Sequence, residues 1–102
     1  MSHVEWVIAT LTEECHLSLQ QLSSLCAVEP EWVLRHLDDG LLSAVKQDGE
    51  EWVFSSAELR RAKRILSIER NFDALPELAA LVADLQEELD GLRRQLRQRP
   101  RG

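Results

Sequence analysis

The sequence predicts a mainly α-helical fold with one small β-ribbon and a long C-terminal helix. Apolar residues recur at helical spacing in several segments, and an Asp-Gly pair separates two short apolar runs. Leucines also follow one another at alternating intervals of three and four over residues 75–96. With 102 residues, of which 44% are hydrophobic, the chain is long enough to bury one modest core.

Two short helices are predicted over residues 18–40. Ser18 and Gln21 form a capping-box pattern, which marks the start of the first helix. Its apolar residues then follow at helical spacing: Leu19, Leu22, Leu25 and Cys26. Pro30 is tolerated only in the first turn of a helix, so a second helix begins there, and Gly40 ends it. Two such helices joined by a tight turn form a helix-turn-helix unit.

Two β features are predicted around this unit. Residues 41–46 and 51–54 flank the Asp-Gly turn signal and form a two-stranded ribbon, or wing. Trp52 and Phe54 share one face of it, and we expect them to cover the core rather than to bind a partner. Residues 4–12 are rich in β-branched and apolar types and predict a short strand or an ordered lead-in.

A third helix is predicted from the capping-box pair Ser55 and Glu58 to about Asn71. One face of it is apolar, and the rest carries basic residues, namely Arg60, Arg61, Lys63, Arg64 and Arg70. We interpret these charges as a solvated face in preference to a nucleic-acid patch, because one helix carries most of them.

The last helix is predicted to be capped by Asp73, with Pro76 in its first turn. A narrow apolar seam on this polar helix predicts a coiled-coil dimer, since the helix alone cannot bury it. The predicted dimerisation residues are Leu78, Val82, Leu85, Leu89, Leu92 and Leu96. Leu81 widens the stripe and is expected to face the chain's own domain. We therefore divide the chain into a domain over 1–72 and a dimerisation helix with a frayed tail over 73–102.

The charge is distributed unevenly along the chain. The net charge is −6, but residues 1–54 hold ten acids against two bases, whereas residues 55–102 carry a small positive excess. An anionic first half is repelled by DNA phosphates and attracts a basic protein surface.

Enzyme, metal and membrane functions are not expected. The conceivable metal ligands are Cys15, His16, Cys26 and His36, but no CxxC or HxxxH pair joins them, so we expect no metal site. No catalytic set or phosphate-binding glycine loop is present, which argues against an enzyme and a cofactor. The chain has neither a bilayer-length apolar run nor a signal-peptide pattern, so we expect a cytoplasmic protein that does not contact membranes.

The order of these elements resembles the MerR-type winged helix with its dimerising coiled coil. The matching segments are Leu17–Val28, Glu29-Pro30 and Gly40–Leu42. The chain is more closely similar to the CbpM family of chaperone modulators, through Trp52–Phe54, Leu59–Leu66 and Leu89–Leu96. The resemblance implies a MerR-like winged helix-turn-helix with a β-ribbon wing and a C-terminal dimerising coiled-coil helix.

The resemblance to the CbpM family also implies a function. Such proteins are dimers that bind the J-domain of the DnaJ-like co-chaperone CbpA, and so oppose both its work with the Hsp70 chaperone and its DNA binding. They have no enzyme activity and no cofactor. The alternative is a MerR-type DNA-binding transcriptional regulator, which would have to use basic residues of the third helix: Arg60, Arg61, Lys63 and Arg64.

Departures from DNA-binding MerR proteins favour the chaperone-modulator interpretation. Counting back from Gly40, Leu34 takes the place of the arginine that those proteins present to DNA, and Arg35 takes that of the next aromatic residue. Trp52 stands where the wing usually has an arginine. The acids surrounding the second helix and the wing are Glu29, Glu31, Asp38, Asp39, Asp48, Glu50 and Glu51.

These departures define a predicted partner-binding surface. Its residues are Glu29, Glu31, Trp32, Leu34, Arg35, Asp38 and Asp39. We expect Trp32 and Leu34 to be an exposed apolar anchor within an acidic rim. Partial burial of Trp32 against the wing is the alternative.

Overall fold

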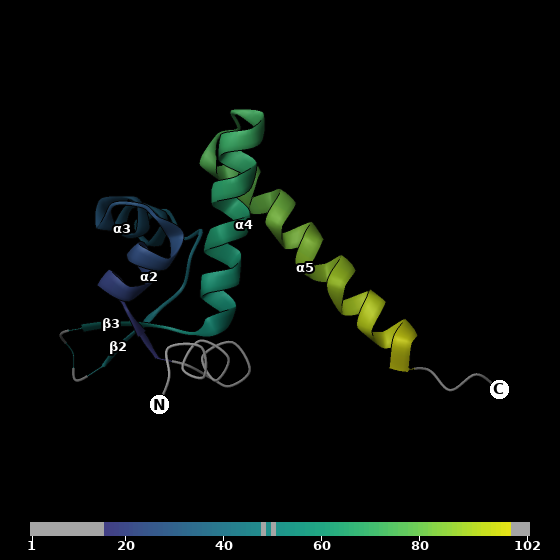
Figure 1. The fold of residues 1–102 in the computed structure, drawn as a ribbon, viewed down its shortest axis with the longest axis horizontal. Coiled ribbons are helices and arrows are strands. Elements are labelled where there is room, and N and C mark those ends of the chain that lie inside the picture. The colour runs from purple at the N-terminus through teal and green to yellow at the C-terminus, as the bar shows by residue number, and fades with distance from the viewer. Residues whose placement is uncertain (1–15, 48, 50, 99–102) are drawn as a thin grey trace.

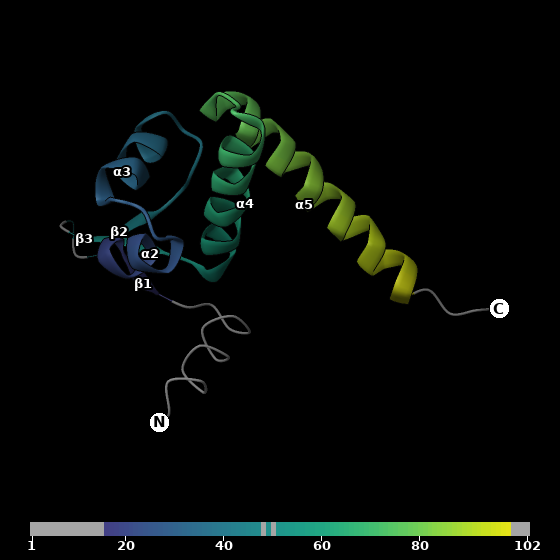
Figure 2. The same ribbon diagram turned by 45° about the horizontal axis from the view of Figure 1, so that its top comes forward.

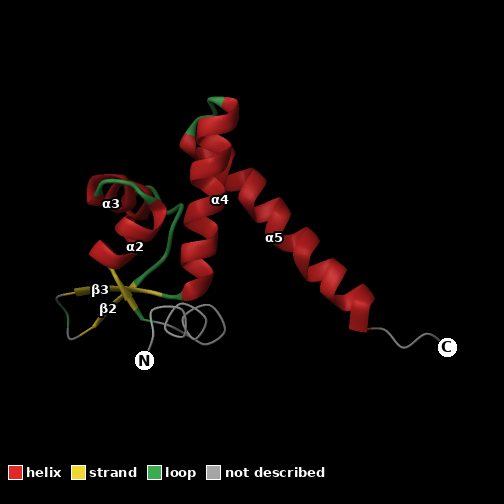
Figure 3. Cartoon of the chain, in the orientation of Figure 1, coloured by secondary structure: helices red, strands yellow, loops and turns green. Residues whose placement is uncertain are grey.

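The computed structural model describes residues 16–47, 49 and 51–98. The elements follow one another as β1 (Leu17–Ser18), α2 (Leu19–Cys26), α3 (Pro30–Asp38), β2 (Val45–Gln47), β3 (Glu51–Phe54), α4 (Ser56–Phe72) and α5 (Pro76–Gln98) (Figure 1). The predicted mainly helical class with a small wing is confirmed, as the colouring by secondary structure makes plain (Figure 3). The strand expected over 4–12 and the frayed tail expected at 99–102 lie outside the described residues.

The ends of α2 and α3 follow the predicted signals. The Ser18 hydroxyl accepts the Gln21 N–H at 3.1 Å, and the Gln21 side chain accepts the Ser18 N–H at 2.8 Å, so the capping box is confirmed. Pro30 is the first residue of α3. Gly40 has a φ of +75° after that helix, and the Leu41 N–H donates to the His36 carbonyl at 2.8 Å, which closes the helix as a Schellman motif.

The wing is wider than predicted, because β1 joins it. The antiparallel sheet has the order β1-β3-β2, with Leu17 opposite Phe54 and Val45 opposite Val53. A two-residue strand has no periodicity from which it can be predicted, so the sequence indicated only two strands. Phe54 is buried and Trp52 packs against the core while half-buried, which confirms that this face covers the core.

The core lies between the sheet, α2, α3 and the inner face of α4. Its largest fully buried side chains are Leu17, Leu22, Val33, Phe54 and Ile65. Ser55 caps α4 by accepting the Glu58 N–H at 3.2 Å. The Glu58 carboxylate accepts the Ser43 N–H at 2.5 Å and so ties the α3–β2 connection to α4. Helix α4 thus packs against α2 and α5 and is tied to the α3–β2 connection by this hydrogen bond.

The last helix packs on α4 through alanines, and not through the leucine stripe. Ala79, Ala80 and Ala83 are buried, whereas Leu81 is 55% exposed, so the expectation that Leu81 faces its own domain is wrong. Small side chains allow the two helix backbones to approach closely, which a leucine at this contact would prevent. Figures 1 and 2 show α5 diverging from α4 towards its C-terminal end.

The turn between α4 and α5 also differs from the prediction. Asp73 has a φ of 50° and forms the left-handed C-cap of α4, so its expected role as the cap of the last helix is wrong. The last helix begins at Pro76, because proline fits a first turn. Within the described residues, no helix combines the length and apolar character needed to cross a bilayer.

Candidate partner-binding surface

Helix α3 presents the predicted site. Val33 and His36 are the buried residues of the helix and point into the domain. The side chains that alternate with them are exposed, namely Glu31, Leu34, Arg35 and Asp38, and so are the flanking residues Glu29 and Asp39. Within the described part of the chain, none of the four acids Glu29, Glu31, Asp38 and Asp39 forms an ion pair. This helix therefore carries carboxylates that are available to a partner.

Trp32 is not the exposed anchor that the sequence predicted. Its ring is half-buried and stacks on the His36 ring with the centroids 3.8 Å apart, and its Nε1–H donates to the Glu69 carboxylate at 3.2 Å. The alternative, partial burial against the wing, is correct about the partial burial but wrong about the contact. The ring packs against residues of α3 and α4, and not against the wing. Trp32 is drawn there because Glu69 of α4 provides a hydrogen-bond acceptor for the indole N–H.

His36 joins α3 to α4 through the same carboxylate. Its Nε2 lies 2.7 Å from the Glu69 carboxylate and its Nδ1 lies 2.7 Å from the Trp32 carbonyl oxygen. Both ring nitrogens therefore have partners inside the protein. Across the described residues, no group of three or more potential metal ligands comes together. Cys15, one of the conceivable ligands, lies outside the described residues.

Two grooves flank α3 and divide the predicted surface. The first, here called the α3–α4 groove, has a volume of about 890 Å³ and is lined by Ala27, Val28, Glu29, Glu31, Trp32, Arg35, Leu66, Glu69, Arg70, Asp73 and Ala74. The second, the α3–wing groove, has a volume of about 530 Å³ and is lined by Leu34, Leu37, Asp38, Leu42, Ser43, Ala44 and Trp52. The structure thus brings four predicted residues together in one groove, puts Leu34 and Asp38 in the other, and leaves Asp39 outside both.

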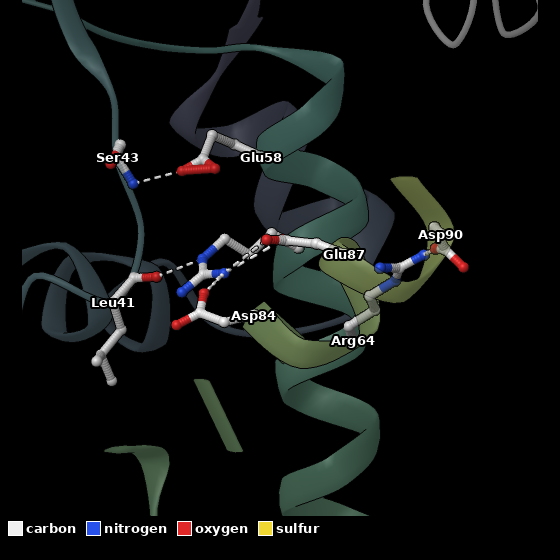
Figure 4. A network of polar contacts seen from close by, with 8 residues as sticks. Leu41, Ser43, Glu58, Arg64, Asp84, Glu87 and Asp90 are labelled. Atoms are coloured by element: carbon white, nitrogen blue, oxygen red, sulfur yellow. Dashed lines mark hydrogen bonds and ion pairs between the residues drawn. The ribbon is translucent and has the colours of Figure 1, made fainter. Parts of the chain in front are cut away.

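The basic residues of α4 are in part engaged by α5. Arg61 donates from Nε to the Leu41 carbonyl at 2.8 Å, and from Nη1 to Asp84 at 2.6 Å and to Glu87 at 3.1 Å. Arg64 forms an ion pair with Asp90, which holds the pKa of that carboxyl below its usual value (Figure 4). Two of the five basic residues are thereby neutralised within the chain, whereas Arg60, Lys63 and Arg70 are exposed.

This network was not among the predictions, although the sequence contains a signal for it. Arg61 and Arg64 are three residues apart on α4, and Asp84, Glu87 and Asp90 repeat at the same spacing on α5. Residues three apart lie on one helix face, so two rows of opposite charge meet when the helices pack. Figure 4 shows the three carboxylates, Leu41 and Arg64 gathered around this contact.

Burial affects two other titratable groups. Desolvation raises the pKa of Glu58, even though the Ser43 N–H and the nearby Arg61 act to lower it. Desolvation likewise raises the pKa of the buried Cys26 thiol. A thiol in that state is a poor nucleophile at neutral pH.

The leucine seam of α5 is exposed in the single chain. Leu85 and Leu89 are 57% and 46% exposed, and Leu78, Leu92 and Leu96 are exposed as well, while Val82 is half-buried against the core. Phe72, which the sequence analysis left out, is 76% exposed at the end of α4, close to the start of the seam. The helix thus presents a long apolar face on the side turned away from α4.

Comparison with known proteins places the chain in a family. The model of the family described as MerR HTH family regulatory protein matches residues 17–99. This region begins at β1 and includes every helix of the described structure. None of the curated proteins matches the chain, and neither does any solved structure. Because the match spans well over half of the sequence, the chain belongs to the MerR HTH family of regulatory proteins.

Proposed function

We propose that this protein is a homodimeric, cytoplasmic binding module that docks on the J-domain of a DnaJ-like co-chaperone of the CbpA type. Binding prevents that co-chaperone from stimulating Hsp70 and from binding DNA. The protein itself has no enzymatic activity and needs no cofactor. The observation that carries this proposal is the state of the charges: among the described residues the carboxylates of α3 form no ion pair, while Arg61 and Arg64 of α4 are paired with α5.

Electrostatics supports a protein partner over DNA for α3. DNA affinity is dominated by cation–phosphate contacts, and four acids on and beside this helix oppose them. A J-domain exposes a basic helix, so its approach to the same surface is accelerated by attraction. Such an interaction loses strength as salt screens the charges, with a Debye length of about 10 Å at 0.1 M.

The exposed seam supports the homodimer. Burying one leucine stabilises an assembly by roughly 1.5–3 kcal/mol, and a second copy offers the same seam. Residues 77–90 of α5 carry five acids and no base, and Glu77 and Glu88 among them form no ion pair in the described residues, whereas residues 91–98 carry three arginines. An antiparallel pair places the basic end of one helix beside the acidic part of the other, so we infer this direction.

Calorimetric titration of a purified J-domain into the protein tests the binding function. We expect a complex that weakens as salt is raised, and loss of J-domain-stimulated Hsp70 ATPase activity. The triple variant E31K/D38K/D39K should bind more weakly, and E51K on the wing is a single-site control that also reverses a carboxylate. Absence of heat at low salt with the folded wild-type protein would reject the proposal.

Sedimentation equilibrium tests the dimer separately. Wild-type protein should have twice the 11.7 kDa mass of the chain, and L85E/L89E should be monomeric. The matched control is Q86E/Q95E, which also adds two carboxylates to the same helix, at exposed positions outside the seam. A monomeric wild-type protein at micromolar concentration would refute the assembly.

A DNA-binding regulator is the second candidate. The observation behind it is that Arg60 and Lys63 of α4 are exposed and could contact phosphates. A gel-shift assay with promoter and random DNA at low salt decides between the two. Clear retardation that disappears in R60E/K63E would support this function instead of J-domain binding.

A further inference from the structure

We propose that the partner binds in the α3–α4 groove, and not in the α3–wing groove, and that the bound segment is a cationic amphipathic helix. This inference rests on the proposed function and identifies its contact surface. The two grooves lie on opposite flanks of the same helix, so the choice between them determines which residues recognise the partner.

The α3–α4 groove has an apolar floor between two polar rims. Val28, Trp32, Leu66 and Ala74 contribute the apolar lining, and Val28, Trp32 and Ala74 also pack against the core. One rim follows α3 and its N-terminal turn, and the other follows the last turns of α4. An amphipathic helix lays its apolar stripe on such a floor and its charged flanks along such rims.

The charge of the rims determines which charge a partner must carry. Four acids line this groove, namely Glu29, Glu31, Glu69 and Asp73, against the two bases Arg35 and Arg70. Its net charge is therefore negative, which attracts a helix whose apolar stripe is bordered by lysine or arginine. Arg70 opposes that attraction, so reversing it should strengthen binding.

The α3–wing groove lacks this complementarity among the residues that the structure describes. Its described lining is largely apolar, and Asp38 is the charged residue in it. Leu34 stands at its exposed edge at 40% exposure, which is modest beside the seam of α5. Among the described residues, a cationic helix would find one carboxylate there, compared with Glu29, Glu31 and Asp73 in the α3–α4 groove, where Glu69 is already engaged by Trp32 and His36.

The shape of the α3–α4 groove is held by contacts between its walls. Glu69 on α4 accepts hydrogen bonds from Trp32 and pairs with His36 on α3. These bonds fix the Trp32 ring, which forms part of the floor, before a partner arrives. Preorganisation of this kind lowers the cost of ordering side chains on binding.

Tryptophan fluorescence distinguishes the two grooves, since each contains one tryptophan. A W6F/W52F variant reports Trp32 alone, and a W6F/W32F variant reports Trp52 alone. On titration with a J-domain that has no tryptophan, we expect the emission of Trp32 to shift and that of Trp52 to stay constant. A shift of Trp52 without a shift of Trp32 would overturn the inference.

Charge variants provide a test that leaves the tryptophans intact. At low salt we expect E31K to weaken J-domain binding about three- to tenfold and R70E to strengthen it by a similar factor. D38K in the α3–wing groove is the matched control and should have a smaller effect than E31K. If the J-domain binds wild type, E31K and R70E equally, the inference fails and the proposed function stands; if wild type binds no J-domain, the proposed function fails.

Discussion

Helices α3 and α4 differ in how the fold treats their charges. On α3, Glu29, Glu31, Asp38 and Asp39 face solvent without an ion pair in the described part of the chain. On α4, Arg61 is 15% exposed in its side chain and meets two carboxylates of α5, and Arg64 meets a third. A count of charges along the sequence treats both helices alike, although the acids of α3 are all free of ion pairs in the described residues, whereas Arg61 and Arg64 of α4 are not.

The difference has an energetic basis. A charge that is partly buried needs a partner, because desolvation is costly, whereas an exposed carboxylate is stabilised by water. Helix α5 provides partners where it packs on α4, and no element described here covers the outer side of α3. We therefore expect changes on α4 to affect stability first, and changes on α3 to affect binding first.

The largest effect is expected for R61M. It removes four hydrogen bonds and leaves the Leu41 carbonyl and two carboxylates without their donor, so the free energy of unfolding should fall by about 2–3 kcal/mol. Urea denaturation at fixed protein concentration measures it. R60M, on the exposed side of the same helix, should change stability by less than about 0.5 kcal/mol. If R61M and R60M lower the free energy of unfolding equally, the network contributes no more to stability than an exposed arginine does.

The second effect concerns the availability of the arginines. The variant D84N/E87Q/D90N frees Arg61 and Arg64, so its affinity for heparin or random DNA should rise about tenfold at low salt. E29Q/E31Q/D39N is the matched control, because both triples raise the net charge from −6 by the same amount. If the two triples gain affinity equally, net charge alone governs polyanion binding, and pairing across α4 and α5 does not matter.

A smaller effect is expected at the end of α3. Asp39 is the C-cap of this helix, where the dipole is negative, so D39N should stabilise the protein by about 0.3–1 kcal/mol. D39E keeps the charge and should leave stability nearly unchanged. Urea midpoints of the three proteins give the comparison, and a destabilised D39N would mean that this carboxylate has a favourable role in the fold.

The smallest effects concern pH. The Arg64 hydrogen bond lowers the pKa of Asp90 in the folded state, so its contribution is present above the unfolded pKa and is lost as the pH falls through the folded value. Burial raises the pKa of Glu58, so the folded state loses stability as the pH rises from the unfolded to the folded value. Urea midpoints between about pH 3 and 6 should therefore change in opposite senses in D90N and E58Q relative to wild type. Parallel changes would contradict these assignments.

Much of the fold was predictable because its signals are local. The Ser18 cap, the Pro30 start and the Gly40 stop depend on residues within a few positions of one another, and each was confirmed. The errors occurred where two signals competed. Asp73 has the side chain of a helix N-cap, but it adopts the left-handed conformation that ends α4, which aspartate also tolerates.

The candidate site was predictable in part. Its acids could be assigned to the outer side of α3, because Val33 and Leu37 mark the inner side at helical spacing. The location of Trp32 was not predictable, since its acceptor lies 37 residues away on α4. The division into two grooves likewise depends on where the wing and α4 lie relative to α3.

The sequence by itself determined the helices, the wing turn and the exposed leucine seam of α5, because propensity, capping and periodicity act over short distances. Only the tertiary structure decided that Ala79, Ala80 and Ala83 make the α4 contact, that Arg61 and Arg64 are paired, and that Trp32 is held by Glu69. These outcomes depend on close packing between residues that are distant in the chain, and packing selects among faces that local patterns leave equivalent.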